Sequence, residues 1–430
     1  MRIDEIFSFE KGVLQSSKCV PGDFDFITAS SDWKTHKEYT HDCEALIFAA
    51  AASGSLGRTH YVNGKFVSSD LCFIITPKDQ VNLPVDLKFY HILFNELKDE
   101  IVRNTKAGTS KEAIGLGSFG KYELPYFDIE TQIEIKNQFV NSEETKSSLT
   151  TELNEQVGLV KKLRQQLLQD AVQGKLVEQN KKDEPASELL KKIKAEKTKL
   201  IAEKKLKKEK ELPPIKPEEI PFDIPENWVW CYFGDLSQLI NGDRSKNYPN
   251  RHEYVYEGYP WINTGHIEPD GTLTKTEMYF ITKEKFDSLR SGKIQSDDLV
   301  YCLRGATFGK TAFVTPYNRG AIASSLMIIR LSNLIDKKFV YYYLKSDFAM
   351  QQLYRFNNGS AQPNLAANDV NRYFFPLPPL SEQNRIVEKL DELMQYCNEL
   401  ETSIKQSESQ NEKLLQQVLR EALRKEPVEV

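Results

Sequence analysis

The sequence has few cysteines and no long apolar run. Its 430 residues include 6 cysteines that are scattered along the chain, without the paired spacings of a zinc site or a disulfide framework: Cys19, Cys43, Cys72, Cys231, Cys302 and Cys397. The longest apolar run, residues 45–52, is too short to cross a bilayer, and the first residues lack the apolar core of a signal peptide. We therefore expect a cytoplasmic protein with no membrane partner.

The short patterns that mark catalytic or metal sites are also missing. The chain has no Asn-Pro-Pro-Tyr or Asp-Pro-Pro-Tyr tetrapeptide, which is expected of an amino-methyltransferase. Residues 115–120 spell G-x-G-x-x-G, but a dinucleotide loop must open a helix, and Pro125 follows too soon. His36, His41 and Cys43 match no closed metal site. Spacing alone leaves a Ser-His-Asp or Cys-His site open, but nothing points to one, so we expect a non-catalytic chain that binds no metal or cofactor.

The charge balance excludes a generic polycation but not a nucleic-acid reader. The formal net charge is −5, with 28% charged and 40% hydrophobic residues. Sequence-specific binding requires only a local basic face. The composition therefore fits a globular chain of two or three domains without deciding its ligand.

The chain repeats itself. Residues 162–171 (KLRQQLLQDA) return as residues 413–422 (KLLQQVLREA), and the helix entrance at 124–128 (LPYFD) is answered by 377–381 (LPPLS). Shorter matches join residues 46–48 with 299–301, 57–59 with 309–311, 68–73 loosely with 324–329, and 117–118 with 359–360. The pattern predicts an internal pseudo-twofold repeat of a globular unit followed by a long helix.

Changes in composition divide the chain into six segments. The fold class expected for the globular segments is α/β (α+β), because short apolar runs alternate with Gly, Asn and Ser turns and with helical patterns. We expect a first domain at 1–125, a long helix at 126–180, a charged helix and Pro-rich linker at 181–227, a second domain at 228–379, a second long helix at 380–425 and a tail at 426–430.

The two long helices have apolar residues at three- and four-residue steps, which form the expected seam. They are Ile129, Ile133, Leu149, Leu153, Val160, Leu163 and Leu167 in the first helix, and Ile386, Leu390, Leu393, Cys397, Leu400 and Ile404 in the second. In the first helix, Asp128 is the expected N-cap, Gly174 the expected stop, and residues 141–148 a polar interruption. In the second, Ser381 is the expected cap, and Ser407 and Asn411 are polar positions inside the seam. We expect an intramolecular antiparallel coiled coil. The alternative is that each helix packs only on its own domain.

The segment 181–227 joins the two halves. Its many lysines and glutamates favour a solvated helix with i,i+4 charge pairs, used as a connector, over a helix that contacts DNA phosphates. Five prolines between 213 and 225 predict a stiff extended linker.

Glycine-spaced loops rich in basic and amide side chains are the candidate binding elements. Such loops let the backbone approach a phosphate, while Arg, Asn and Gln read base edges. Singly, each loop is more often a solvated turn, and it is their recurrence in both halves that favours function. The candidate DNA-binding residues are Arg58, Thr59, Arg244, Lys246, Asn263, Thr264, Arg304, Lys310, Thr311, Ser360, Gln362 and Asn364.

Several stretches resemble the DNA-specificity (S) subunits of Type I restriction-modification systems. They are residues 375–387 (FPLPPLSEQNRIV), 167–177 (LLQDAVQGKLV), 359–365 (GSAQPNL) and the linker from 183–187 (DEPAS) to 226–230 (ENWVW). The resemblance covers nearly the whole chain. Residues 126–130 (YFDIE) depart from it, since they replace the family's Pro-rich, Ser-Glu-Gln helix entrance.

The resemblance implies a function and partners. Each globular unit would be a target recognition domain for one half of an interrupted double-stranded DNA sequence. The paired helices would set the spacer and dock two methyltransferase subunits, and restriction translocase subunits would complete the complex. S-adenosylmethionine and ATP/Mg would be bound by those partners. The helix positions expected to dock them are Leu153, Leu163, Leu167, Ile386, Leu390, Leu393, Leu400 and Leu414.

Two rival interpretations remain open at this point. In the first, the chain is a coiled-coil scaffold without DNA specificity. In the second, it is a fragment of a fused restriction-modification enzyme. Methyl transfer by the isolated chain would favour the enzyme fragment. A steep salt dependence and a preferred duplex sequence would exclude the scaffold.

Overall fold

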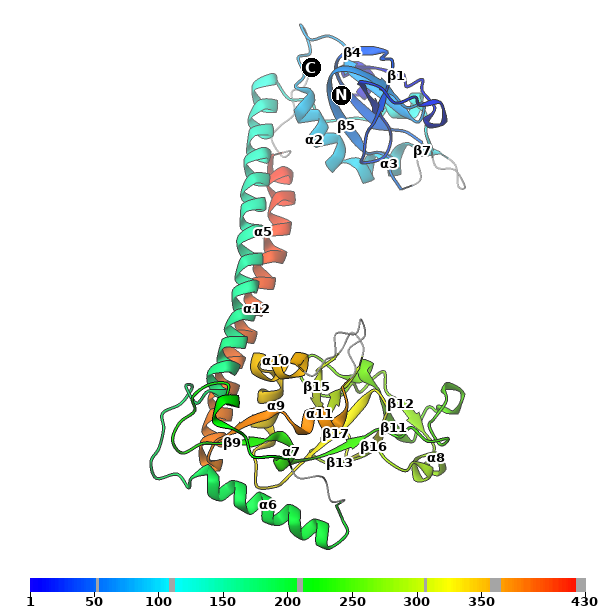
Figure 1. Cartoon of the computed structure of the whole chain (residues 1–430). Helices are drawn as coiled ribbons and strands as arrows, with labels where there is room; N and C mark the ends of the chain where they lie inside the picture. The colour runs from blue at the N-terminus through cyan, green and yellow to red at the C-terminus, as the bar shows by residue number, and fades with distance from the viewer. Residues whose placement is uncertain (52–53, 108–112, 207–211, 305–307, 356–364, 423–430) are drawn as a thin grey trace. The chain divides into compact units, whose positions relative to one another are not determined.

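The computed structural model divides the chain into two compact units (Figure 1). Unit 1 is Met1–Glu155 with Lys405–Val430, and unit 2 is Gln156–Ile404. The structure describes all residues except 52–53, 108–112, 207–211, 305–307, 356–364 and 423–430, and it does not describe the side chains of 414–416, 418–420 and 422. Each long helix contributes to both units.

Unit 1 is built on a six-stranded sheet in the order β1-β6-β4-β5-β2-β3, in which only β2 and β5 pair in parallel. Its elements are α1 (Ile3–Ile6), β1 (Phe7–Lys11), η1 (Ser16–Lys18), β2 (Phe24–Ile27), β3 (Lys34–His36), β4 (His41–Ala49), β5 (Thr59–Ser68), β6 (Cys72–Pro77), α2 (Leu87–Glu96), α3 (Lys98–Thr105), β7 (Lys106–Ala107), β8 (Ala113–Ile114) and α4 (Leu116–Gly120). Aromatic rings such as Phe48, Tyr90 and Phe119 fill its core. The G-x-G-x-x-G run forms the five-residue helix α4, not the start of a long one.

Unit 2 contains two four-stranded sheets and one two-stranded sheet, in the orders β10-β17-β14-β15, β12-β11-β16-β13 and β18-β9. Its elements are α6 (Ala186–Ala202), η2 (Pro217–Glu219), β9 (Val229–Tyr232), α7 (Phe233–Leu236), β10 (Ser237–Asn241), η3 (Arg251–Glu253), β11 (Tyr259–Ile262), η4 (Thr264–His266), β12 (Tyr279–Ile281), α8 (Lys283–Ser288), β13 (Lys293–Gln295), β14 (Leu299–Cys302), β15 (Thr311–Phe313), β16 (Arg319–Ile322), β17 (Leu326–Leu331), α9 (Lys337–Lys345), α10 (Asp347–Arg355), α11 (Ala367–Asn371) and β18 (Phe374–Leu377).

The two units share a four-strand arrangement. The order β1-β6-β4-β5 in unit 1 matches β10-β17-β14-β15 in unit 2. Leu46 pairs with Ile75 in the first sheet, and Leu299 pairs with Ile329 in the second, so the predicted match of residues 46–48 with 299–301 holds in three dimensions. The same register corrects the loose match of residues 68–73 with 324–329 by two residues, because Ile75 and not Phe73 is equivalent to Ile329.

The units differ beyond these four strands. In unit 1, β5 is one continuous strand that pairs with β4 and, further along, in parallel with β2. In unit 2, the corresponding strands β15 and β16 are separate and lie in different sheets, and β16 pairs in parallel with β11. The four matching strands, which we call the shared frame, therefore have different neighbouring strands in the two units.

A buried glutamine ties the first turns of each long helix to its domain. In unit 1, the fully buried Gln132 accepts a hydrogen bond from Asp86 N–H (2.8 Å) and donates to the Phe127 carbonyl (2.7 Å) and the Pro84 carbonyl (3.0 Å). Asp86 in turn caps α2 by accepting from the N–H groups of Lys88 and Phe89.

Unit 2 contains the same arrangement. The fully buried Gln383 accepts from Asp336 N–H (2.9 Å) and donates to the Pro378 carbonyl (2.9 Å), and Asp336 caps α9. Gln132 and Gln383 are 251 residues apart, the spacing of the helical repeat. The predicted match of residues 124–128 with 377–381 has an offset of 253 residues, so the glutamines correct it by two residues.

The long helices are α5 (Ile129–Val172) and α12 (Leu380–Ala422). Asp128 caps α5 as predicted, because its carboxylate accepts from Thr131 N–H (2.9 Å), and Gly174 follows the helix with a φ of 71°. The prediction for Ser381 was wrong. The carbonyl of Pro379 accepts from the N–H groups of Glu382 and Gln383, so Ser381 lies inside the first turn of α12.

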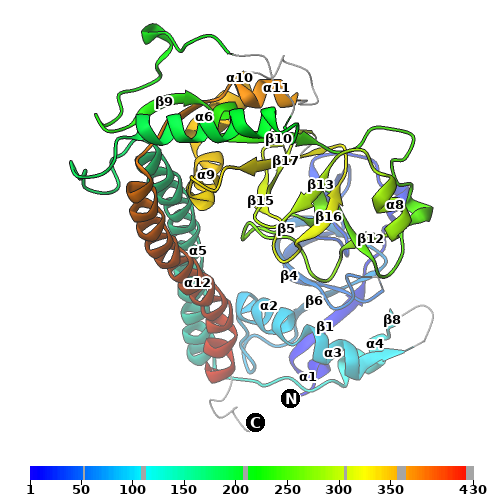
Figure 2. The ribbon, with the colours of Figure 1, turned by 90° about the horizontal axis from the view of Figure 1, so that it is seen from below.

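Within each unit the two helices run side by side and contact each other (Figures 1 and 2). In unit 2, the Arg164 guanidinium donates to Asn398 Oδ1 (2.8 Å) and to Glu401 Oε2 (3.1 Å). In unit 1, the buried Asn411 donates to the Lys146 carbonyl and to Thr150 Oγ1 (both 3.2 Å). Polar groups therefore form part of the contact in both units.

The apolar seam is shifted from the predicted one. Leu163 and Leu400, expected inside the seam, are 44% and 50% exposed, and Ile133 and Leu149 are also exposed. The buried apolar residues include Leu153, Val160 and Leu168 on α5, and Ile386, Leu390, Cys397 and Ile404 on α12. In α12, Leu390, Cys397, Ile404 and Asn411 recur at seven-residue steps, which is a heptad repeat.

The segment after α5 is not the solvated connector that we expected. Ala186, Leu189 and Ile193 bury one face of α6 in the core of unit 2, and Figures 1 and 2 show α6 against that unit. Lys191 pairs with Glu188 at i,i+3, while Lys192 and Lys194 pair with Glu184 and Asp235 outside the helix.

The proline-rich stretch is packed as well. Ile215, Phe222 and Ile224 lie against the same core, and the Phe222 ring stands edge-on to Trp230 and Phe348 at 5.0 Å in each case. The stretch is therefore part of unit 2 and not a free spacer. Along the described chain, no helix is both long enough and apolar enough to cross a membrane.

We predict that Gln132→Ala destabilises unit 1. The change leaves the buried Asp86 N–H and the Phe127 carbonyl without partners, and each such group costs about 1–3 kcal/mol. Denaturant unfolding followed by near-UV circular dichroism measures the loss. Gln138→Ala on the exposed side of α5 is the matched control, with an expected change within about 0.5 kcal/mol. Equal stability of the two variants would contradict the role of the buried glutamine.

Candidate nucleic-acid interface

The turn between β4 and β5 in unit 1 presents Arg58. The N–H of Ala49 donates to the Arg58 carbonyl (2.8 Å), and the N–H of Gly57 donates to the Ala49 carbonyl (2.8 Å). Gly57 has a φ of 82°, a left-handed conformation that favours glycine. Arg58 thus lies between the left-handed Gly57 and the first residue of β5.

The turn between β14 and β15 in unit 2 has the same hydrogen bonds. The N–H of Cys302 donates to the Lys310 carbonyl (2.8 Å), and the N–H of Gly309 donates to the Cys302 carbonyl (3.0 Å). Gly309 has a φ of 81°. Lys310 is exposed. The predicted match of residues 57–59 with 309–311 is confirmed, and both units place a cation at the same point of their shared frame.

The threonines of these turns are structural. Thr59 is 2% exposed and Thr311 is 6% exposed, and each hydroxyl donates to the carbonyl of the preceding turn glycine, Gly57 or Gly309. The backbone N–H of Thr59 also donates to Asn95 Oδ1 (3.0 Å). Both hydroxyls are therefore bonded within their own turns, and the assignment of the two threonines as DNA-contacting residues stays a prediction.

Arg58 is connected to the loop after β2. Its guanidinium donates to the Ala29 carbonyl (3.4 Å). In the same region the exposed Trp33 stands edge-on to the His60 ring at 5.8 Å. Burial lowers the pKa of His60, so Arg58 and not this histidine supplies positive charge there at neutral pH.

Arg304 lies at the end of β14 and is half-buried. Its Nε–H is buried without a hydrogen-bond partner in the described part of the chain. Residues 305–307 of the same loop lie outside the described residues, as do the predicted contact residues Ser360, Gln362 and Asn364. Arg304 thus follows β14, and the exposed Lys310 directly precedes β15.

Arg244 and Lys246 are exposed on a loop that a buried carboxylate holds. Asp243 is 2% exposed and accepts from Ser245 N–H (2.6 Å) and Arg290 N–H (2.5 Å). Burial alone would raise the pKa of Asp243, but these hydrogen bonds outweigh it and lower the pKa. The loop therefore presents two cations from an ordered backbone.

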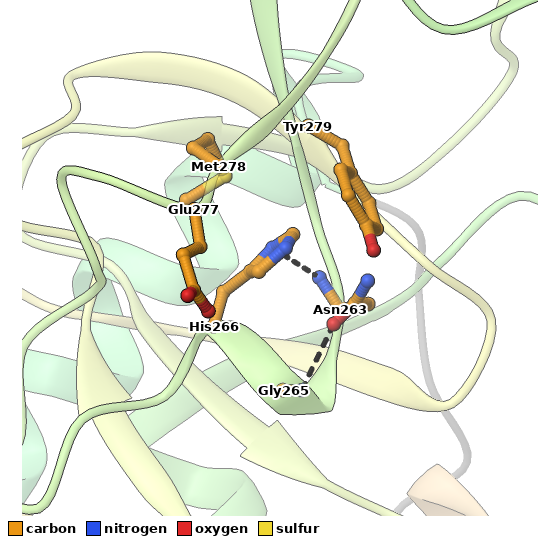
Figure 3. A pocket seen from close by; sticks show the side chains of 6 residues that line it. All are labelled: Asn263, Gly265, His266, Glu277, Met278 and Tyr279. Atoms are coloured by element: carbon orange, nitrogen blue, oxygen red, sulfur yellow. Dashed lines mark hydrogen bonds between the residues drawn. The ribbon is translucent and has the colours of Figure 1, made fainter. Parts of the chain in front are cut away.

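Asn263 lines a pocket of about 440 Å³ after β11, together with Gly265, His266, Glu277, Met278 and Tyr279 (Figure 3). Its Oδ1 accepts from Gly265 N–H (2.9 Å), and its own N–H donates to His266 Nδ1 (3.2 Å). Burial lowers the pKa of His266. Thr264, between these residues, is half-buried and does not line the pocket.

Three of the positions predicted to dock partners are buried within the chain. Leu153, Ile386 and Leu390 are at most 4% exposed, and Ile386 and Leu390 pack in the core of unit 2. Leu167 and Leu393 are half-buried, Leu163 and Leu400 are exposed, and the side chain of Leu414 lies outside the described atoms.

Sequence reasoning missed the residues that orient these sites. Asp243, Glu277 and Tyr279 carry no recognisable motif. Gln132 and Gln383 could have been found from the sequence, because they are 251 residues apart, as are residues 162 and 413 of the helical repeat. The missed exposed apolar residues Leu159 and Tyr396 lie four residues before Leu163 and Leu400.

No group of three metal-ligating side chains was found among the described residues. His36 Nδ1 accepts from Val20 N–H (3.0 Å), and His41 Nε2 contacts Glu10 (2.7 Å). All six cysteines are free thiols. The polar chemistry in the described residues is therefore that of hydrogen-bond donors, acceptors and cations on ordered turns.

The curated relatives of the chain are specificity subunits of Type I restriction enzymes. The chain is 33% identical to the EcoAI specificity subunit of Escherichia coli over 253 residues, which are 56% of this chain and 41% of that protein. It is 29% identical to the EcoEI specificity subunit of Escherichia coli over 266 residues, 60% of this chain and 43% of that protein. These two matches thus span less than half of each relative. The EcoDI specificity subunit of Escherichia coli matches at 22% identity over 99% of this chain and 88% of its own.

Solved structures show the same fold. The HsdS subunit of Thermoanaerobacter tengcongensis matches with a TM-score of 0.60 at 16% identity, covering 99% of this chain and 96% of that one. A chain from a structure of the type I R-M system matches with a TM-score of 0.59 at 18% identity, covering 99% and 97%. The sequence model of the Type I restriction modification DNA specificity domain matches residues 1–159 and 225–407, which together are most of the chain. The chain belongs to this family of Type I restriction-modification DNA specificity proteins.

Proposed function

We propose that this chain selects the DNA target of a Type I restriction-modification complex, and that each unit binds one half of an interrupted duplex sequence. The observation that carries the proposal is a shared strand frame that places a cation at the same turn in both units, Arg58 and Lys310, among different surroundings. A common frame suits one mode of docking to the duplex. Divergent loops suit two different half-sites.

The basic residues divide into two roles. Lys310, Arg244 and Lys246 are exposed and suit phosphate contacts, which fix orientation without reading sequence. Arg304 is half-buried and suits a base contact, because Arg reads guanine O6 and N7 in the major groove. The net charge of −5 is no obstacle, since these cations are local.

We expect Lys310→Ala and Arg304→Ala to weaken binding in different ways. Lys310→Ala should weaken all duplex sequences alike and lower the salt slope by about 1, whereas Arg304→Ala should relax one position by about 1–3 kcal/mol. Titration of the full chain with duplex pools at several salt concentrations measures both effects.

The matched control is Lys199→Ala, which removes an exposed lysine on α6 and should leave binding unchanged. Loss of binding in this control would favour α6 as the phosphate-binding element. Unchanged binding in the Arg304 and Lys310 variants would contradict the loop assignment. Binding by the wild-type chain that does not depend on salt would favour the scaffold interpretation.

The proposal extends to the helices. Paired antiparallel, α5 and α12 would form a coiled-coil spacer that relates the two half-sites and docks two methyltransferase subunits, and the two halves would be related by a pseudo-twofold axis. Hydrogen bonds from Arg164 to α12 and from Asn411 to α5 support the pairing. Methyl transfer from S-adenosylmethionine and ATP/Mg-dependent cleavage would belong to the partner subunits, and this chain would be non-catalytic.

The docking surface is best sought among exposed apolar residues of unit 2. Leu159 and Leu163 on α5, and Tyr396 and Leu400 on α12, each form an i,i+4 pair on one helix face. When α5 and α12 pair antiparallel, these two helix faces lie on the same side of the contact between the helices. Four exposed apolar side chains on one side of a rod suit a protein partner.

We predict that Leu163→Glu and Leu400→Glu each weaken methyltransferase binding about tenfold or more, because each change places a charge in an apolar contact. Co-purification and titration with the methyltransferase measure the loss. Lys161→Glu is the control, since Lys161 is exposed on α5 away from this surface. If both leucine variants kept full affinity while the melting temperature stayed unchanged, the docking surface would lie elsewhere.

A further inference from the structure

The pocket after β11 is bounded by one unused donor and one unused acceptor. Figure 3 shows the Asn263 amide and the Glu277 carboxylate on opposite sides of the His266 ring. The Asn263 Oδ1 is occupied by Gly265 N–H, so the amide is oriented and its Nδ2 is the free end. No acceptor for Nδ2 is found in the described residues.

The carboxylate is unused in the same sense. Glu277 is exposed and makes no hydrogen bond or ion pair with any residue that the structure describes. Two other glutamates in unit 2 are paired: Glu253 with Lys285 (2.6 Å), and Glu382, which accepts from Gln179 (2.6 Å). An unpaired carboxylate repels phosphate, so this pocket does not suit the DNA backbone.

The wall of the pocket is aromatic. Tyr279 is 46% exposed, stands edge-on to His266 at 4.9 Å and stacks on Tyr254 at 5.1 Å. The stack holds a flat apolar surface beside the two polar groups. A planar ligand edge with polar atoms at its rim matches this arrangement.

We propose that this pocket reads the exocyclic amino group of one DNA base, adenine N6 or cytosine N4. Glu277 accepts from the amino group, and Asn263 Nδ2 donates to an acceptor beside it, such as a purine N7. Asn263 alone cannot read adenine with both ends of its amide, because Gly265 occupies Oδ1. Donor and acceptor are therefore divided between two residues. Guanine and thymine present a carbonyl oxygen where the amino group would lie, and Glu277 repels it.

The inference rests on the proposed function and adds a residue-level cause of base choice. The test uses the native host with Glu277→Gln as the only copy of the chain, followed by a genome-wide map of methylated bases. A glutamine amide accepts or donates at the same place. We therefore expect one position of one half-site to lose its preference for adenine or cytosine by about tenfold, while the other positions stay unchanged.

The matched control is Glu257→Gln, which removes an exposed carboxylate of unit 2 outside the pocket and should leave the motif unchanged. An unchanged motif with Glu277→Gln would overturn the pocket assignment. So would a uniform loss of methylation at every site, since that result indicates a general role in folding or docking. Absence of any motif that depends on the wild-type chain would overturn the proposed function, and the inference with it.

Modified duplexes separate the two amino groups. At the position found, purine replaces adenine or 2-pyrimidinone replaces cytosine, so that only the amino group is removed. Binding of the wild-type chain should fall about tenfold with one of these replacements, and binding of a Glu277→Ala chain, which has no acceptor at this place, should not fall further. Equal losses in both chains would show that Glu277 does not contact the amino group.

Discussion

The bond network around one buried glutamine in each half is the constraint on which the structure depends. Gln132 and Gln383 each join three parts of their unit: the segment that enters the long helix, the helix itself and the N-cap aspartate of a domain helix. Asp86 and Asp336 are held and also cap α2 and α9. Because each amide is fully buried, it cannot exchange these bonds for water without cost. The start of each long helix is thereby fixed to the domain that precedes it.

This attachment leaves the loops free to differ. The turn between β4 and β5 and the turn between β14 and β15 have the same hydrogen bonds, and a cation follows the left-handed glycine in each, Arg58 after Gly57 and Lys310 after Gly309. Around them the units diverge: β5 is continuous in unit 1, but its counterpart is divided between two sheets in unit 2. Unit 2 also has the pocket with Asn263 and Glu277, whereas unit 1 places Trp33, after β2, edge-on to His60 of β5. A constant attachment with variable loops is what a protein with two different half-sites requires.

Much of this architecture could be predicted from the sequence, and the failures have physical causes. The repeat was visible in residues 162–171 and 413–422, and the match of Gly57 with Gly309 held because a left-handed turn tolerates few other residues. The seam was misplaced at Leu163 and Leu400, since leucines also occupy exposed helix faces that can bind partners. The hydrogen bonds of Thr59 and Thr311 within their own turns were not predicted, because composition does not show whether a hydroxyl bonds its own turn. The packed linker and the pocket depend on contacts between residues far apart in sequence, which no local pattern reveals.

The account stands on the claim that this chain chooses a two-part DNA sequence. The most direct test is a genome-wide map of methylated bases in the native host, with the chain present and deleted. The account predicts that deletion removes methylation at a single interrupted motif with two half-sites and a fixed spacer, and that restoring the chain restores it. An unchanged map, or loss of a continuous motif without a spacer, would contradict the claim.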